Sequence, residues 1–155
     1  MWTELKGDAC GIAFGGDGSL YKSDCLGYIY QYYEKHDKWK QLGHTRADRL
    51  AADANGALWI ESYENKIARW ISNKWVEMGL ADATYVTAGK QSQVFALASP
   101  RGTDETVYRW VGDTWAKMNG GMASYITVGK NSNLYITDSE NKIFQSLSFN
   151  AEMEG

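Results

Sequence analysis

The sequence of 155 residues is poor in several residue types that define common protein classes. It has one proline, two cysteines and two histidines, and no CxxC or HExxH spacing, so we expect neither a metal site nor a cofactor. No apolar run approaches the roughly 20 residues that a membrane-spanning helix needs, so we expect no membrane insertion. The first 20 residues lack the basic start and apolar stretch of a secretion signal, which favours a cytoplasmic location.

The charge balance excludes another class of partner. Sixteen Lys and Arg residues stand against 19 Asp and Glu residues, giving a net charge of −3. A protein held on nucleic acid by phosphate contacts needs a basic excess that displaces counterions, and none is present. We therefore expect no nucleic-acid binding.

Glycines and aromatic residues are abundant. The chain has 16 glycines, seven tryptophans and ten tyrosines, and aromatic residues make up 14% of it. Aromatic residues favour strands and glycines favour tight turns, so this composition predicts an all-β protein. The length suits one domain.

The sequence contains a fourfold internal repeat, which has to be identified before any local structure is assigned. Three blocks recur in the same order in each copy. The first block has the pattern W-x-x-[LM] and begins at Trp2, Trp39, Trp75 and Trp115. The second block aligns without gaps over Ile12–Tyr21, Leu50–Trp59, Val86–Phe95 and Ile126–Tyr135, and the third over Ile29–Tyr32, Ile67–Trp70, Val107–Trp110 and Ile143–Ser146.

Each copy divides into short strands separated by turns. Asp17-Gly18 and Asn55-Gly56 lie between two apolar runs, a pattern typical of a two-residue type I′ hairpin. Gln91-Ser92 and Asn131-Ser132 occupy the same position in the other copies. The segment 46–53 has high helix propensity, but its alignment with three strand-like copies predicts a strand.

Four strands in 36–40 residues, repeated four times, predict a β-propeller of four four-stranded blades. We assign residues 1–149 to one propeller domain and 150–155 to a C-terminal tail. The repeats span about 2–38, 39–74, 75–114 and 115–149.

The three blocks together resemble the tectonin repeat. The resemblance covers the chain from Trp2 to about Phe149, although copies three and four lack the turn glycine and copy four has Ser146 where the others have an aromatic residue. The resemblance implies a β-propeller. It also implies one of two functions: a lectin that binds glycans, or an intracellular interaction platform of membrane-trafficking proteins.

Two groups of residues are candidates for ligand binding. The first group ends the third strand of each copy, and the second lies in matching loops between the second and third strands. The candidates are Tyr32, Trp70 and Trp110 in the first group and Tyr63, Glu64, Asn65, Glu140 and Asn141 in the second. The alternative for the loop residues is ordinary turn chemistry. The periodic tryptophans could also stack on sugar rings, but for them we favour packing between blades: Trp2, Trp39, Trp75 and Trp115.

Catalytic residues are not evident. His36 and His44 flank Trp39 without a nearby nucleophile motif, and Asp104-Glu105 are chain neighbours on a loop. We expect a non-enzymatic binding protein. The leading function is glycan binding through several weak, equivalent sites between the blades or in the loops, and the alternative is a protein-interaction platform.

Two further predictions concern the cysteines and the chain ends. A two-residue turn at Asp17-Gly18 would place Cys10 directly opposite Cys25, so we expect adjacent sulfurs and leave open whether they are bonded. Residues 2–5 would form a strand beside residues 143–147 and close the last blade. We favour closure within one chain, a monomer, with a strand-exchanged dimer as the alternative.

Overall fold

The computed structural model describes residues 1–91, 93–99, 105–129 and 133–146. These residues form fourteen β-strands and one short 3-10 turn, Glu34–His36. No helix in these ranges is long and apolar enough to span a membrane. The all-β prediction is confirmed.

The strands form successive antiparallel units, which we call blades 1 to 4. Blade 1 contains β1 (Gly11–Phe14), β2 (Leu20–Ser23), β3 (Tyr28–Tyr33) and the first part of β4 (Lys38–Ala52). Blade 2 contains the second part of β4, then β5 (Leu58–Ser62), β6 (Ile67–Ile71) and β7 (Lys74–Glu77). Blade 3 contains β8 (Ala83–Ala88), β9 (Val94–Ala98), β10 (Thr106–Trp110) and β11 (Trp115–Met122). Blade 4 contains β12 (Tyr125–Val128), β13 (Leu134–Thr137) and β14 (Ile143–Gln145).

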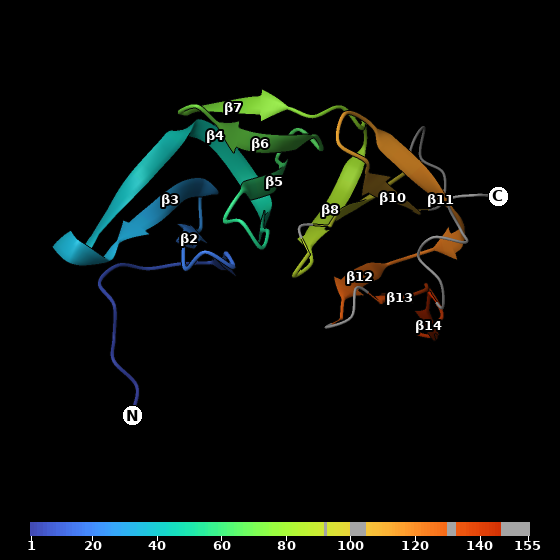
Figure 1. Ribbon diagram of the computed structural model, residues 1–155, viewed down its shortest axis with the longest axis horizontal. Helices are drawn as coiled ribbons and strands as arrows, with labels where there is room; N and C mark the ends of the chain where they lie inside the picture. Colours follow the sequence, from blue (N-terminus) through green and yellow to red (C-terminus); the bar gives the residue numbers. More distant parts are fainter. Residues whose placement is uncertain (92, 100–104, 130–132, 147–155) are drawn as a thin grey trace.

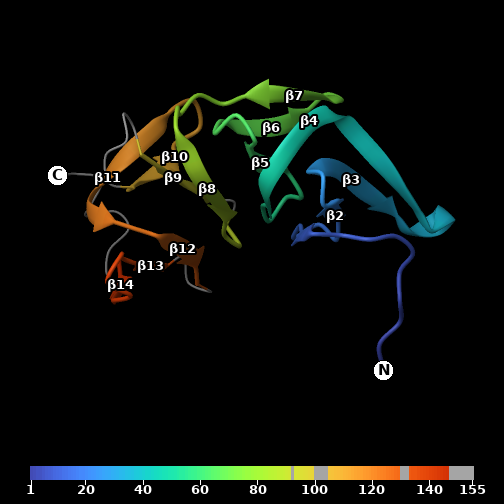
Figure 2. The ribbon, with the colours of Figure 1, turned by 180° about the vertical axis from the view of Figure 1, so that it is seen from behind.

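The blades follow one another along an arc that is open on one side (Figures 1 and 2). The first strands of neighbouring blades contact one another, because β4 touches β1 and β8, and β8 touches β12. The N-terminus lies at one end of the arc and β14 at the other.

Strand β4 belongs to two blades. Its first residues pair with β3, as in Tyr32 with Trp39, and its last residues pair with β5, as in Ala51 with Trp59. Between the two stretches the chain turns at Gly43, whose φ is 64°. The predicted strand over 46–53 is confirmed as part of β4, so the helix propensity of this segment is overridden by pairing on both sides.

The apolar core consists of three clusters, one at each junction between blades. The cluster at the junction of blades 1 and 2 includes Leu42, Leu58 and Ile60, with Trp75 packed against it. A repeated hydrogen bond accompanies this packing, because three of the four W-x-x-[LM] tryptophans donate their Nε1–H to a carbonyl of the preceding copy. The three bonds are Trp39 to Lys6 (2.7 Å), Trp75 to Leu42 (2.7 Å) and Trp115 to Met78 (2.8 Å). In each case the acceptor precedes a glycine of positive φ: Gly7, Gly43 and Gly79.

The predicted two-residue hairpins are wrong. Phe14 pairs with Leu20, and the Gly18 N–H donates to the Gly15 carbonyl at 3.0 Å, which makes a three-residue loop with Gly18 at φ 92°. The Gly56 turn has the same pattern, with φ 82°. A type I turn followed by one left-handed residue requires positive φ of the glycine alone, whereas a type I′ turn also requires it of the preceding residue.

The longer loop shifts the register by one residue but keeps the cysteines together. The Cys10 N–H donates to the Ser23 carbonyl at 2.9 Å, and Cys25 lies in the turn that follows β2. Cys10 and Cys25 form a disulfide with a Cα–Cα distance of 5.0 Å. The predicted proximity is confirmed, and the question of bonding is answered in favour of a disulfide.

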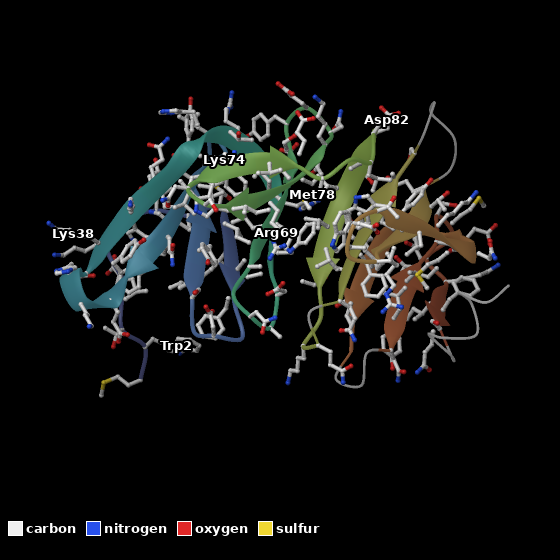
Figure 3. All side chains as sticks on the ribbon, turned by 45° about the horizontal axis from the view of Figure 1, so that its top comes forward. Trp2, Lys38, Arg69, Lys74, Met78 and Asp82 are labelled. Carbon is white, nitrogen blue, oxygen red and sulfur yellow. A yellow bond between two sulfur atoms is a disulfide. The ribbon has the colours of Figure 1, made fainter. Side chains whose placement is uncertain are left out.

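The predicted closure of the last blade is absent from the part of the chain that the structure describes. Residues 1–5 form no strand, and Trp2 is fully exposed at the end of the arc away from blade 4 (Figure 3). Within these ranges blade 4 has three strands, because β14 pairs with β13 alone. The final residues of the expected 143–147 strand and the tail at 150–155 fall partly or wholly outside the described ranges.

Candidate functional site

The first group of candidate ligand residues forms aromatic pairs within the blades. Each member faces the tryptophan of the next strand across the outer hairpin: Tyr32 with Trp39, Trp70 with Trp75, and Trp110 with Trp115. The ring centroids lie 5.0, 5.0 and 5.3 Å apart. Trp70 and Trp110 are half-buried against the junction clusters. These rings therefore contribute to packing, and the structure does not bring them together into one site.

Two of the loop candidates have a clear backbone role. Asn65 and Asn141 have φ values of 57° and 63° and occupy the left-handed position of equivalent three-residue turns. Asparagine tolerates this conformation better than most residues. The neighbouring carboxylates, Glu64 and Glu140, pair with the lysine two residues further along the chain.

Tyr63 and Glu64 line a groove of about 590 Å³ at the junction of blades 1 and 2. Its walls come from the bend in β4, the turn between β5 and β6, and strands β6 and β7. The groove brings these two candidates together with residues that are distant in sequence: His44, Thr45, Arg46, Ser62, Lys66, Ala68, Trp75 and Glu77.

One wall of the groove is a tyrosine held between blades. Tyr63 is 42% exposed, and the Arg46 guanidinium carbon lies 4.3 Å from its ring centroid. The Tyr63 N–H donates to the Arg46 carbonyl at 3.0 Å, and Arg46 Nε donates to the Leu26 carbonyl at 2.6 Å. The ring also lies against Gly27, where a Cβ atom would come within 2.9 Å of it. The ring is thus oriented by contacts with both blades while part of its surface faces solvent.

Three of the charged groups of the groove form ion pairs. Lys66 Nζ lies 3.0 Å from Glu77 Oε1 and 3.6 Å from Glu64 Oε2. The hydrogen bond from Lys66 to Glu77 raises the pKa of the lysine, because the nearby carboxylate stabilises the ammonium form. Together with Arg46, the groove presents two cations and two carboxylates, so its charge balances.

Sequence reasoning missed Arg46, Lys66, Trp75 and Glu77 as groove residues. Arg46 and Glu77 lie in segments assigned to strands, and Trp75 was assigned to packing, which its bond to Leu42 supports. Lys66 follows the candidate turn directly, and its repetition as Lys142 was a usable signal. Glu140 and Asn141 lie in blade 4 and do not reach this groove. Within the described ranges no group of three or more His, Cys, Asp or Glu side chains could hold a metal ion.

A buried carboxyl lies outside the groove. Glu61 in β5 is only 3% exposed, and burial raises its pKa to about 7, with a further increase from Asp48 and an opposing effect of Arg49. The equivalent positions of the other repeats hold Ser23, Leu97 and Thr137, so the acid is specific to blade 2.

No protein-family model matches the chain, and no curated protein matches it. Solved structures do resemble it. TolB from Acinetobacter baumannii matches with a TM-score of 0.63 and 11% identity, over 87% of this chain and 39% of that chain. Dihydro-heme d1 dehydrogenase NirN matches with a TM-score of 0.68 and 11% identity, over 90% of this chain and 35% of that chain. A chain of the mitotic checkpoint complex matches with a TM-score of 0.65 and 7% identity, over 90% and 49%.

These three neighbours are β-propellers, so the fold of the chain is that of a β-propeller. The chain spans less than half the length of each of them.

Proposed function

We propose that this chain is a non-enzymatic binding module and that the groove between blades 1 and 2 binds a glycan. The observation that carries the proposal is the composition of the groove. It combines the part-exposed ring of Tyr63 with paired, charge-balanced polar groups at one place. The resemblance of the repeats to tectonin repeats, which include lectins, supports the same function.

A sugar needs both features. The apolar face of a pyranose packs on an aromatic ring, and its hydroxyl groups need donors and acceptors in fixed positions. Lys66 and Arg46 supply donors, and Glu64 and Glu77 supply acceptors. Because the charges of these groups balance, the groove suits a neutral sugar better than an acidic one.

The proposal narrows the expectation of several equivalent sites to one site. The turn that holds Tyr63 in blade 2 holds Cys25 in blade 1 and Ser139 in blade 4. The position of Arg46 is occupied by Met122 before blade 4. The aromatic and cationic groups therefore do not recur with the repeat at these junctions.

A glycan array with competition by free monosaccharides tests the proposal. Tyr63→Ala should reduce binding about tenfold or more, because it removes the stacking surface. Tyr33→Ala is the matched control, since Tyr33 is exposed to a similar extent, 40%, and does not line the groove. Absence of binding to any glycan, or equal losses in the two variants with unchanged melting temperatures, would contradict the proposal.

The alternative is a protein-interaction platform. The exposed charges of both signs in the groove favour it, and one propeller of similar fold comes from the mitotic checkpoint complex. A charge reversal separates the two functions. Lys66→Glu together with Glu77→Lys keeps the ion pair but inverts its direction, so it should abolish recognition of a charged protein surface. Binding of a neutral sugar should fall by a smaller factor.

A further inference from the structure

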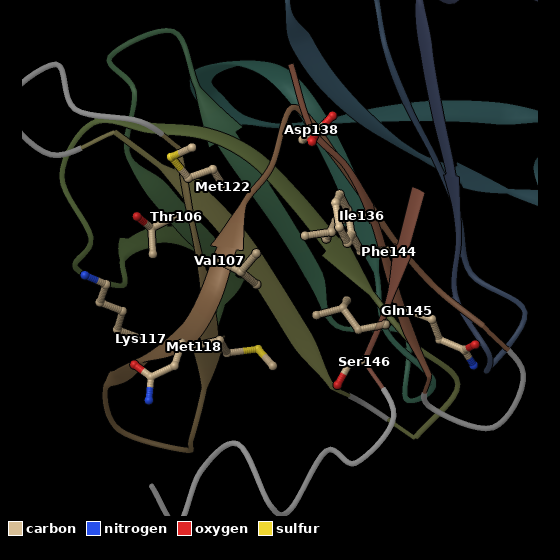
Figure 4. Close-up of a pocket in the computed structure, with 12 residues that line it drawn as sticks. Thr106, Val107, Lys117, Met118, Met122, Ile136, Asp138, Phe144, Gln145 and Ser146 are labelled. Carbon is tan, nitrogen blue, oxygen red and sulfur yellow. The ribbon is translucent and has the colours of Figure 1, made fainter. Parts of the chain in front are cut away.

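The junction of blades 3 and 4 contains a cavity of about 610 Å³ (Figure 4). Side chains from β10 and β11 face those from β13 and β14 across it. Its apolar lining includes Met118, Leu134, Ile136 and Phe144. The repeat relates these four positions to Leu42, Leu58, Ile60 and Ala68, which belong to the apolar cluster of the first junction beside the groove described above.

The first junction contains two tryptophans that the second lacks. One is Trp70, whose position in blade 4 is held by Ser146. The other is Trp75. At the first junction the indole of Trp75, from the fourth strand of blade 2, packs against the cluster. Residues 116–155 contain no tryptophan, so none of them supplies the equivalent indole to blade 4. The cavity therefore has the location and lining of an indole site.

Among the residues that the structure describes, the outer edge of blade 4 is unpaired as well. Strand β14 pairs with β13 alone within the described residues, and Ile143 and Phe144 are 76% and 48% exposed. The Ser146 hydroxyl lines the cavity and is buried, with no hydrogen-bond partner among the described residues. An edge strand with exposed apolar side chains is a template for pairing with a further strand.

A matching strand exists at the start of the chain. The segment Trp2–Leu5 has the W-x-x-[LM] pattern of the other fourth strands but forms no strand, and Trp2 is fully exposed. Lys6 is already placed like a residue at the end of a fourth strand. Its carbonyl accepts a hydrogen bond from the Trp39 indole, as the Leu42 carbonyl does from the Trp75 indole. Residues 2–5 are thus placed as the fourth strand of a blade that would precede blade 1.

The end faces of the arc are complementary. Ile12 and Phe14 on blade 1 are 70% and 68% exposed, whereas the equivalent Leu50 and Ala52 pack on the preceding blade. At the other end Ile143 is exposed, whereas the equivalent Ile67 is fully buried by the following blade. Each end of the arc therefore exposes apolar side chains whose equivalents are buried where two blades meet.

We propose that two copies of this chain close one ring by exchanging their N-terminal strands. Residues 2–5 of each copy pair with β14 of the other copy, and the Trp2 indole fills the other copy's cavity. Its Nε1–H donates to the Asn119 carbonyl. Asn119 precedes Gly120 in the sequence, just as each of the other three acceptor residues precedes a glycine. The segment and the cavity lie at opposite ends of the arc (Figures 1 and 3), so a second copy reaches the cavity more readily than the same chain. Two reciprocal contacts give a closed twofold assembly.

Light scattering over a concentration series tests the assembly. The full chain should show twice the monomer mass of 17.4 kDa. Trp2→Ala and Phe144→Lys should each weaken association about tenfold or more, because one removes the buried anchor and the other places a charge in its site. Leu26→Ala is the control, since Leu26 is 62% exposed and lies in neither contact. It should keep the dimer.

A peptide competitor tests the mode of assembly with the intact chain. A peptide with the sequence of residues 1–7 should dissociate the dimer, and the same peptide with alanine in place of tryptophan should not. A mass of 17.4 kDa at every concentration would overturn the proposal. So would a dimer that persists unchanged in Trp2→Ala and Phe144→Lys, because that dimer would use another surface.

Discussion

The junction of blades 1 and 2 and the junction of blades 3 and 4 are built from equivalent positions. At the first, Leu42 and Ile60 are buried and Trp75 covers them. At the second, the equivalent Met118 is buried but the lining opens into a cavity beside Phe144, which is 48% exposed. The two junctions therefore differ in the two tryptophans that blade 2 adds to its cluster, Trp70 from β6 and Trp75 from β7, neither of which has a tryptophan equivalent among the described residues of blade 4.

The largest effect is expected when Trp75 is removed from the junction of blades 1 and 2. Trp75→Ala should lower the free energy of unfolding by about 3–5 kcal/mol, because it deletes a large packed side chain. It also leaves the Leu42 carbonyl without its 2.7 Å hydrogen bond. Chemical denaturation monitored by circular dichroism measures the change.

Phe144→Ala is the matched test at the junction of blades 3 and 4, which contains the cavity. Because the phenylalanine borders a cavity and is half exposed, the variant should lose less than about 1 kcal/mol in the monomer. A loss as large as that of Trp75→Ala would show that the two junctions are equally packed and would contradict the comparison.

Glu61, the buried acid of blade 2, should make the stability of that blade depend on pH. The pKa of Glu61 is about 7 in the folded protein against 4.5 for an ordinary glutamate. Folding therefore favours the protonated form, and the associated stability is complete below pH 4.5 and lost as the pH rises through 7. Glu61→Gln should remove this dependence and raise the free energy of unfolding at pH 8 by about 3 kcal/mol relative to the parent chain.

The control for this prediction is Glu64→Gln, whose side chain is 77% exposed. Denaturation curves at pH 5 and pH 8 should shift by the same small amount in this variant. If Glu61→Gln also shifts both curves equally, the carboxyl does not titrate between these values and the prediction is wrong.

A smaller effect is expected from the glycine beneath the indole. Gly43 has φ 64°, and a Cβ atom there would lie 2.9 Å from Cδ1 of Trp75. Gly43→Ala should cost about 2 kcal/mol, from backbone strain and displacement of the ring. Gly112→Ala is the control, since Gly112 has φ 100° and open space around it, so strain alone should cost about 1 kcal/mol. Equal losses would mean that the indole moves away freely.

The repeat was the part of the structure most accessible from sequence. Matching blocks over Leu50–Trp59 and Ile126–Tyr135 specify which strands pair and which positions face the next blade, because alternation along a strand fixes the side-chain direction. The same reasoning placed Cys10 near Cys25, although the turn at Gly18 shifted the register by one residue. Turn length depends on backbone angles that a dipeptide pattern leaves undetermined.

The groove was only partly predictable. Tyr63 and Glu64 were identified from a repeated loop, but Arg46 and Glu77 join them through the bend of β4 and the return of β7. Such a meeting of distant segments depends on the angle between neighbouring blades, which periodicity does not determine. The pairing partner of the Trp2 segment was not predictable for a similar reason, because it depends on whether β14 of the same chain or of a second copy lies within reach.

The continuity of β4 has a consequence for how the protein opens. One strand carries hydrogen bonds of two blades, from Tyr33 with Lys38 to Ala52 with Leu58, so blades 1 and 2 form a single seven-stranded sheet. Separating them requires breaking a strand in its middle. Amide hydrogens of β3 and β5 should therefore exchange with solvent at a common opening free energy, as parts of one cooperative unit. Blade 4, whose described residues form a separate three-stranded sheet, should exchange earlier and on its own.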